Sequence, residues 1–308
     1  MRKTLPSLLL LLLASCTLAS PTSTPAPAPT QSQPSAPPRV LAVESFLADI
    51  AQNVAGNRLQ VETLIPLGVD PHAYQPVPSD AAKVADCTVL ILNGAGLESF
   101  LAPLLSNASG QSIITASSGL TPRPDPAGEY TEGDPHFWLD PNNVIRYAEN
   151  IRDGLSQADP AGATLYAANA AAYIEQLQAL DAWITQQVGT LAPERRMLVT
   201  NHESLGYFAE RYGFTVVGAV IPSFSTDAAP TARQMADLIT QIKATGAPAI
   251  FLEVGANPQL AEQIASETGL KVVTQLYTHS LSTLDGPAPT YIDMLKYDVS
   301  QIVAGCRS

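Results

Sequence analysis

The sequence is poor in positive charge and in cysteine. Its 308 residues include 16 Lys+Arg against 28 Asp+Glu, and only 14% of residues are charged, compared with roughly 25% in an average soluble domain. Nucleic-acid binding needs basic side chains to neutralise phosphates, so this balance argues against a nucleic-acid partner. The formal net charge of -12 instead favours the attraction of cations. Three cysteines in the whole chain are too few for a disulfide scaffold.

The N-terminus is typical of a targeting segment. Arg2 and Lys3 precede the apolar run Leu8–Leu13, which is too short to cross about 30 Å of hydrocarbon. The following Leu-Ala-Ser-Cys16 resembles the lipobox of bacterial lipoproteins. We therefore expect residues 1–15 to be a signal peptide and Cys16 to be lipidated, which would anchor the protein outside the cytoplasmic membrane. The alternative is an ordinary signal peptide in which Cys16 is incidental.

Residues 16–38 contain no charged residue and are rich in Pro, Ala, Ser and Thr. Such a segment buries too little surface to offset its ordering entropy, so we expect an extended tether. Cys87 lies in an apolar run and Cys306 two residues before the end of the chain. We expect Cys87 to be a small buried hydrophobe, and a bridge between the two stays open.

From Arg39 onward, short apolar runs alternate with helical patterns. Continuous apolar character is typical of parallel strands covered on both faces. The predicted strands are Leu59–Ile65, Cys87–Leu92, Arg196–Thr200, Thr215–Val220, Ala249–Leu252 and Lys271–Leu276. The predicted helices are Ser45–Val54, Asp80–Val84 with Ser79 as N-cap, Ser204–Tyr212, Ala232–Ala244 and Pro258–Thr268, the last ending at Gly269. This alternation predicts an α/β fold with right-handed crossovers.

One segment has a different composition. Ala161 to about Gly189 is rich in Ala, Gln and Leu, contains no proline, and lies between Pro160 and Pro193. A helix of this length would run about 40 Å. We therefore expect residues 160–190 to form one long helix that joins two α/β lobes with parallel sheets, residues 39–159 and 191–308. The alternative is a long surface helix on a single domain.

The four histidines are the most informative residues. His72 and His136 each stand in an Asp-Pro-His tripeptide within a proline-stiffened loop. His202 follows one predicted strand and His279 another, and ligands of open α/β sheets collect at the carboxyl ends of strands. Each presumed lobe thus supplies two imidazoles, which are the commonest protein ligands of zinc. We expect one tetrahedral metal site in the cleft between the lobes.

The sequence also resembles the zinc/manganese solute-binding lipoproteins of bacterial ABC importers, the TroA-like family. The resemblance covers nearly the whole mature chain. It rests on GVDPHAYQPVPSD at Gly68–Asp80, NGAGLE at Asn93–Glu98, DPHFWLDPNN at Asp134–Asn143, NHESLGYFAERYGF at Asn201–Phe214 and PTYIDMLKYDV at Pro289–Val299. It implies two α/β lobes linked by one long helix, with a single metal ion between them as cargo. The implied partners are an ABC permease and its ATPase, and we expect the protein to be a monomer.

The resemblance places His72, His136 and His202 on the family's metal-ligand positions. The fourth position is usually an Asp, and here it is His279. An all-nitrogen ligand set favours zinc over manganese, which prefers oxygen, although copper, nickel and cobalt stay open. Four neutral ligands leave the charge of the ion unneutralised, so carboxylates behind the rings are expected to offset it. The candidates are Asp70, Asp134, Glu203 and Glu253.

Two other functions fit the sequence less well than metal capture. His202-Glu203 could begin the HExxH helix of a zinc protease, but Gly206 stands where the second His is required. A two-lobed lipoprotein that binds an organic solute, or acts as an adhesin, would have no need of four histidines. The sequence therefore predicts a binding protein and not an enzyme.

Overall fold

The computed structural model describes residues 37–105, 110–125 and 130–307, and residues 37–308 form one compact unit. The expected signal peptide, Cys16 and all but the last two residues of the expected tether lie outside the described residues. Among the described residues, no helix has both the length and the apolar character needed to cross a membrane.

The first half of the chain builds a parallel sheet with strand order β2-β1-β3-β4. Its strands are β1 Val40–Ala42, β2 Val61–Thr63, β3 Val89–Leu92 and β4 Ser112–Thr115. Its helices are α1 Ser45–Ala55, α2 Pro78–Asp86 and the short α3 Ala102–Leu105, preceded by the 3-10 turn η1 Ser99–Leu101. All three strand pairs are parallel, as expected for an α/β lobe.

The second half builds another parallel sheet, with order β6-β5-β7-β8. Its strands are β5 Met197–His202, β6 Thr215–Ile221, β7 Ala249–Glu253 and β8 Lys271–Leu276. Its helices are α6 Gly206–Tyr212, α7 Ala232–Thr245 and α8 Gln259–Thr268. Helix α8 ends at Gly269 in the left-handed conformation, as the sequence predicts.

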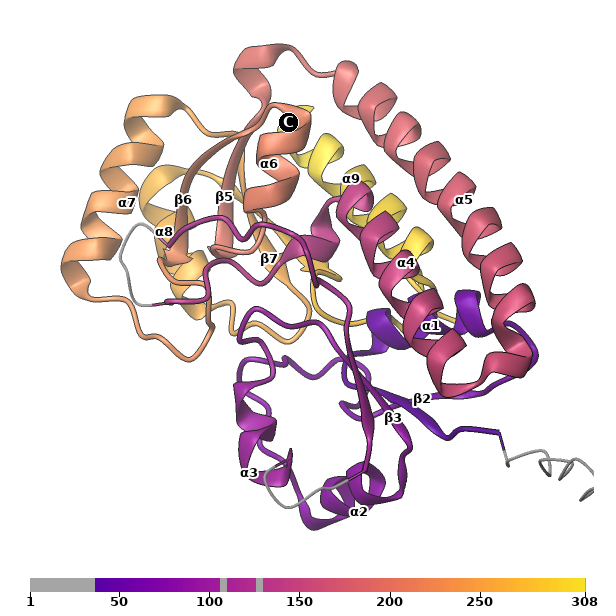
Figure 1. The fold of residues 1–308 in the computed structure, drawn as a ribbon. Helices are drawn as coiled ribbons and strands as arrows, with labels where there is room; N and C mark the ends of the chain where they lie inside the picture. Colours follow the sequence, from indigo (N-terminus) through magenta and orange to yellow (C-terminus); the bar gives the residue numbers. More distant parts are fainter. Residues whose placement is uncertain (1–36, 106–109, 126–129, 308) are drawn as a thin grey trace, which may run out of the picture. The chain divides into compact units, whose positions relative to one another are not determined.

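Helices α4 Pro141–Ala158, α5 Ala163–Gly189 and α9 Tyr291–Arg307 pack beside the sheets (Figure 1). Three 3-10 turns complete the list of elements: η2 Phe137–Leu139, η3 Pro160–Gly162 and η4 Pro193–Arg195. Helix α5 has 27 residues and connects the two lobes. The predicted fold class, two parallel-sheet α/β lobes joined by one long helix, is confirmed.

One apolar cluster runs through both halves. It includes Val40 and Ile91 from the first sheet, Leu177 from α5, Phe251 from β7 and Met294 from α9, all at most 2% exposed. Helix α5 contacts α1, α4 and α9 through this cluster. Smaller clusters fill the outer layers of each half. The lobes therefore share their principal hydrophobic core instead of each having its own.

Some local predictions differ from the structure. All six predicted strands form, Lys271–Leu276 with both ends as predicted and the other five with at least one end shifted. Strands β1 and β4 and helices α3, α4 and α9 were not predicted. The expected N-cap at Ser79 is wrong. Helix α2 begins at Pro78 after Val77, and the Asp80 carboxylate accepts a hydrogen bond from the Val77 backbone N–H at 2.8 Å. Cys87 and Cys306 are buried free thiols, so no bridge joins them.

Candidate metal centre

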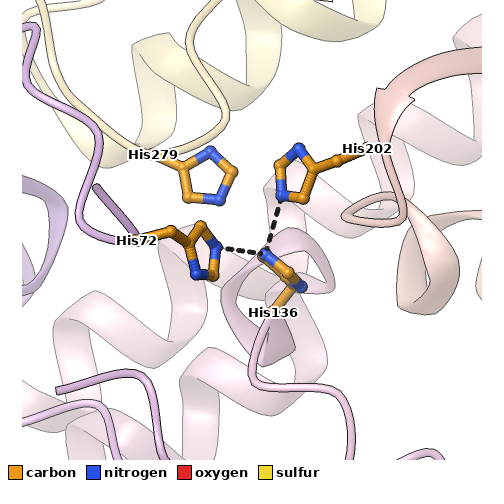
Figure 2. A group of neighbouring side chains, drawn as sticks. All are labelled: His72, His136, His202 and His279. Carbon is orange, nitrogen blue, oxygen red and sulfur yellow. Dashed lines mark hydrogen bonds between the residues drawn. The ribbon is translucent and has the colours of Figure 1, made fainter. Parts of the chain in front are cut away.

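Four imidazoles from four separate segments point toward one another (Figure 2). His72 lies in the loop after β2, and His136 immediately precedes the turn η2. His202 is the last residue of β5, and His279 lies three residues beyond β8. The two strand-end histidines therefore occupy the carboxyl edge of the second sheet.

The spacing of the ring nitrogens suits one small ion. Nε2 of His136 lies 3.1 Å from Nε2 of His72 and 3.2 Å from Nε2 of His202. One ligand nitrogen from each of the four residues lies within 4.8 Å of all the others. Zinc–nitrogen bonds of about 2.0–2.1 Å at tetrahedral angles require nitrogens about 3.3–3.4 Å apart. The arrangement therefore matches a tetrahedral site after small adjustments of the rings.

The rings are withdrawn from solvent. His136 and His202 are fully buried and His279 is 8% exposed, whereas His72 is partly buried. The buried Nε2 of His279 finds no hydrogen-bond partner among the described residues. An unpaired buried polar atom is costly, and a ligand bond to an ion would satisfy it. A cavity of about 290 Å³, lined in part by Asp70, Glu253 and His279, borders the cluster.

Two of the predicted carboxylates lie against ring nitrogens. Asp134 Oδ1 is 2.8 Å from Nδ1 of His136, so the ring's Nδ1–H donates to it and Nε2 keeps its lone pair. Glu253 Oε2 is 3.0 Å from Nδ1 of His202, at ion-pair distance but without an aligned hydrogen bond, and 3.9 Å from Nδ1 of His279. Ser204 Oγ donates to the other oxygen of Glu253 at 2.9 Å and fixes the carboxylate.

The other two predicted carboxylates have different neighbours. Asp70 accepts a hydrogen bond from the backbone N–H of His72 at 2.9 Å and another from Thr226 Oγ1 at 2.6 Å. It therefore holds the backbone of the loop that carries His72 and does not orient the imidazole ring. Among the described residues, no hydrogen bond or ion pair joins Glu203 to an imidazole. Its side chain lines a separate cavity of about 440 Å³ beside β6 and α7.

Burial and charge set the protonation of the rings. Burial lowers the pKa of His72, His136 and His279 well below 6.5, and the neighbouring rings lower it further. Burial also opposes protonation of His202, but the Glu253 carboxylate outweighs it and raises the pKa of His202. Three rings are therefore neutral at pH 7, whereas the Glu253 carboxylate makes His202 hold a proton more readily than the other three.

Sequence reasoning missed Trp138, which links two of the histidine segments. Its Nε1–H donates to the backbone carbonyl of Thr278 at 2.6 Å, next to His279. Its ring centroid lies 5.2 Å from that of His136 and 5.5 Å from that of His279. The signal was available, because Trp138 is one of only two tryptophans in the chain and stands two residues after His136.

This geometry agrees with the comparisons with known proteins. The family model described as "ZnuA: Zinc-uptake complex component A periplasmic" matches residues 40–305. The chain belongs to the ZnuA family. ZnuA-family proteins are metal-binding, substrate-binding components of ABC importers, so this chain is a binding protein and not an enzyme.

Curated relatives match along most of their length. The manganese-binding lipoprotein MntA of Halalkalibacterium halodurans is 37% identical over 268 residues, which cover 87% of this chain and 88% of MntA. The iron-binding protein YfeA of Yersinia pestis is 33% identical and is covered to 86%, with 87% of this chain aligned. The relatives thus carry the names of different metals.

Solved structures share the fold. The Mn-bound periplasmic metal binding protein of Candidatus Liberibacter asiaticus has a TM-score of 0.79 and 33% identity, covering 87% of this chain and 99% of that protein. The periplasmic zinc binding protein TroA of Treponema pallidum has a TM-score of 0.80 and 25% identity, covering 88% and 99%.

Proposed function

We propose that this ZnuA-family chain captures a single Zn²⁺ ion with His72, His136, His202 and His279 and delivers it to an ABC permease driven by its ATPase. The observation that carries the proposal is the cluster of four ring nitrogens within 4.8 Å of one another. It contains no carboxylate oxygen among its ligand candidates. Zinc accepts an all-imidazole tetrahedral set, whereas manganese favours oxygen ligands and higher coordination numbers.

Manganese is the second candidate cargo, because the relative MntA is named a manganese-binding lipoprotein. In this chain a manganese ion would need an oxygen ligand, and the two carboxylates that lie against the rings are already engaged, Asp134 by His136 and Arg123, and Glu253 by Ser204 and His202. The two cargoes are therefore distinguished by the donor set.

Metal competition tests this proposal. The mature protein is freed of metal with a chelator and dialysed against equal concentrations of zinc and manganese, and the bound metal is counted by mass spectrometry. We expect one zinc ion per chain and little manganese. Binding of manganese in preference to zinc, or retention of full zinc affinity when His136 is replaced by Ala, would contradict the proposal.

We further propose that residues 1–15 are removed as a signal peptide and that Cys16 carries the lipid anchor, so that the monomeric protein is tethered by residues 16–38 outside the cytoplasmic membrane. The Leu-Ala-Ser-Cys16 motif supports this, and the relative MntA is itself named a lipoprotein. Labelled palmitate should enter the wild type and not C16A, and light scattering of the soluble 37–308 fragment should give the mass of one chain.

A further inference from the structure

Arg123 connects the surface of the protein to one of the four imidazoles. Its Nη1 donates to Asp134 Oδ2 at 2.8 Å, while Asp134 Oδ1 holds Nδ1 of His136 at 2.8 Å. Its Nε lies 3.3 Å from Glu210 Oε2, a side chain that is 75% exposed. The guanidinium thus stands between an exposed carboxylate on α6 and a fully buried carboxylate that orients a ring.

The backbone around Arg123 is fixed by further hydrogen bonds. The Asp134 N–H donates to the Arg123 carbonyl at 2.9 Å. Tyr207 Oη accepts from the Arg123 N–H at 2.9 Å and donates to the Asp134 carbonyl at 2.8 Å. Gly133 has a φ of +79° and lies so close that a Cβ there would meet the Arg123 carbonyl oxygen at 2.6 Å. The segments of Arg123 and Asp134 are therefore held together by the backbone as well as by the ion pair.

Gly206 provides the space that the guanidinium occupies. A Cβ at Gly206 would meet Arg123 Nη1 at 1.7 Å and Asp134 Oδ2 at 3.0 Å. Gly206 is the first residue of α6, and its own φ does not require glycine. The close approach of Arg123 explains why this position is a glycine. Gly206 is also the position at which the HExxH helix of a zinc protease would have its second histidine.

Arg123 also supplies the counter-charge for Asp134. The Asp134 side chain has no exposed surface and that of Arg123 is 35% exposed. A buried carboxylate without a paired cation is costly, and its remaining oxygen would be free to turn away from the ring. With Arg123 in place, one oxygen is fixed by the guanidinium and the other faces His136.

From these contacts we infer that Arg123, seated over Gly206, is a positioning residue that determines how tightly His136 holds the ion and how fast the ion leaves. The inference rests on the proposed function, because it concerns the same four-histidine site. Loss of a residue that supports a metal ligand typically lowers metal affinity by about 10–100-fold. Arg123 acts through Asp134, so we expect R123A to lower zinc affinity by about tenfold, mainly through faster dissociation.

Two variants perturb the same contact in different ways. R123A removes the charge, whereas G206A keeps the charge and displaces the guanidinium from Asp134. Since Ala favours a helix over Gly, G206A is not expected to destabilise α6 through the backbone. R123K retains a cation without the planar fork and should recover part of the affinity. The control is R146A, because Arg146 forms an ion pair with Glu149 on the same helix α4, and no ion pair joins it to Asp134 or to an imidazole among the described residues.

The experiment measures zinc dissociation from the full mature protein by stopped flow, using a fluorescent chelator in excess. Proton NMR of the zinc-loaded protein follows the low-field Nδ1–H resonance of His136, which reports the Asp134 contact. We expect R123A and G206A to release zinc about ten times faster and to shift this resonance, with R146A unchanged and R123K intermediate.

Two different outcomes would contradict the two proposals separately. If the wild type binds no zinc, the proposed function is wrong. If the wild type binds zinc but R123A and G206A release it within twofold of the R146A rate, the assignment of Arg123 is wrong and the proposed function stands.

Discussion

The protonation of the apo site predicts how many protons zinc displaces. Burial lowers the pKa of His72, His136 and His279 well below 6.5, so under the proposed function these rings would accept zinc at pH 7 without losing a proton. The pKa of His202 is raised, because Glu253 outweighs the effect of burial. Loading at pH 7 should therefore release at most about one proton, and that proton should come from His202.

The pH dependence follows from the same count. With at most one proton released, zinc affinity should fall by no more than about tenfold when the pH drops from 7.5 to 6.5. Four imidazoles with the ordinary pKa of about 6.5 would instead approach a release of four protons below that pH, and affinity would collapse near pH 6. Burial of three rings moves that collapse to a lower pH than the unperturbed pKa of histidine suggests.

Isothermal titration calorimetry in buffers of different ionisation enthalpy measures the released protons directly. At pH 7.0 Asp134, whose pKa is raised to about 6 by burial, is largely ionised and contributes little. The matched variant is E253Q, which keeps the shape and removes the charge that raises the pKa of His202, so fewer protons should be released than from the wild type. Release of three or more protons from the wild type, or an unchanged count in E253Q, would refute the reasoning.

Three further changes have defined outcomes. H279D should shift the competition between zinc and manganese toward manganese by at least about tenfold; unchanged competition in dialysis would argue against His279 as a ligand. W138F leaves the buried carbonyl of Thr278 without its 2.6 Å hydrogen bond, and urea unfolding of the metal-free protein should show a loss of about 1–3 kcal/mol, whereas equal stability would contradict this. Burial raises the pKa of Glu98 to about 7, so between pH 4.5 and 7 the unfolded chain loses a proton from Glu98 that the native state keeps. The contribution of Glu98 to stability therefore falls by about 3 kcal/mol as the pH rises over this range, on top of the changes that the histidines cause. E98Q should lack that fall, and parallel stability curves for the two proteins would disprove the assignment.

Repeated motifs show where sequence reasoning stops. Asp70 and Asp134 stand in the same Asp-Pro-His tripeptide, and sequence alone gave them the same role. In the structure only Asp134 reaches its ring, because Arg123 holds its second oxygen, whereas Thr226 of the other lobe engages Asp70. The partners that decide the difference are far away in sequence and carry no local signal.

Two neighbouring residues at the end of β5, His202 and Glu203, face different parts of the structure, and the sequence alone did not distinguish them. His202 ends β5 and points into the cluster, while the next residue, Glu203, faces a different cavity. Glu253, which the sequence analysis named with Glu203 as a candidate carboxylate behind the rings, is the one that meets His202. Strand ends could be predicted from apolar runs, but which side chain faces the site depends on the strand order.

The missed elements divide into two kinds. Strand β1 has only three residues and runs almost directly into α1, so it offers too short a pattern to recognise. Helix α4 buries Val144, Tyr147, Ile151 and Leu155 along one face, which is a regular helical spacing. That helix could have been predicted, whereas β1 becomes evident only from its two parallel neighbours.

The core common to both sheets has a consequence for the exchange of the ion. Pulling the halves apart as rigid bodies would expose side chains from α5, α9 and both sheets to water at once, at about 25 cal/mol for each Å² of apolar surface. Release of the ion by movement of the loops that carry His72 and His279 therefore costs less free energy than release by a wide opening of the two halves about a hinge. A permease that withdraws one of those loops would have to break a few hydrogen bonds, such as those from Trp138 to Thr278 and from Thr226 to Asp70, and the shared core of the receptor would stay intact for the next ion.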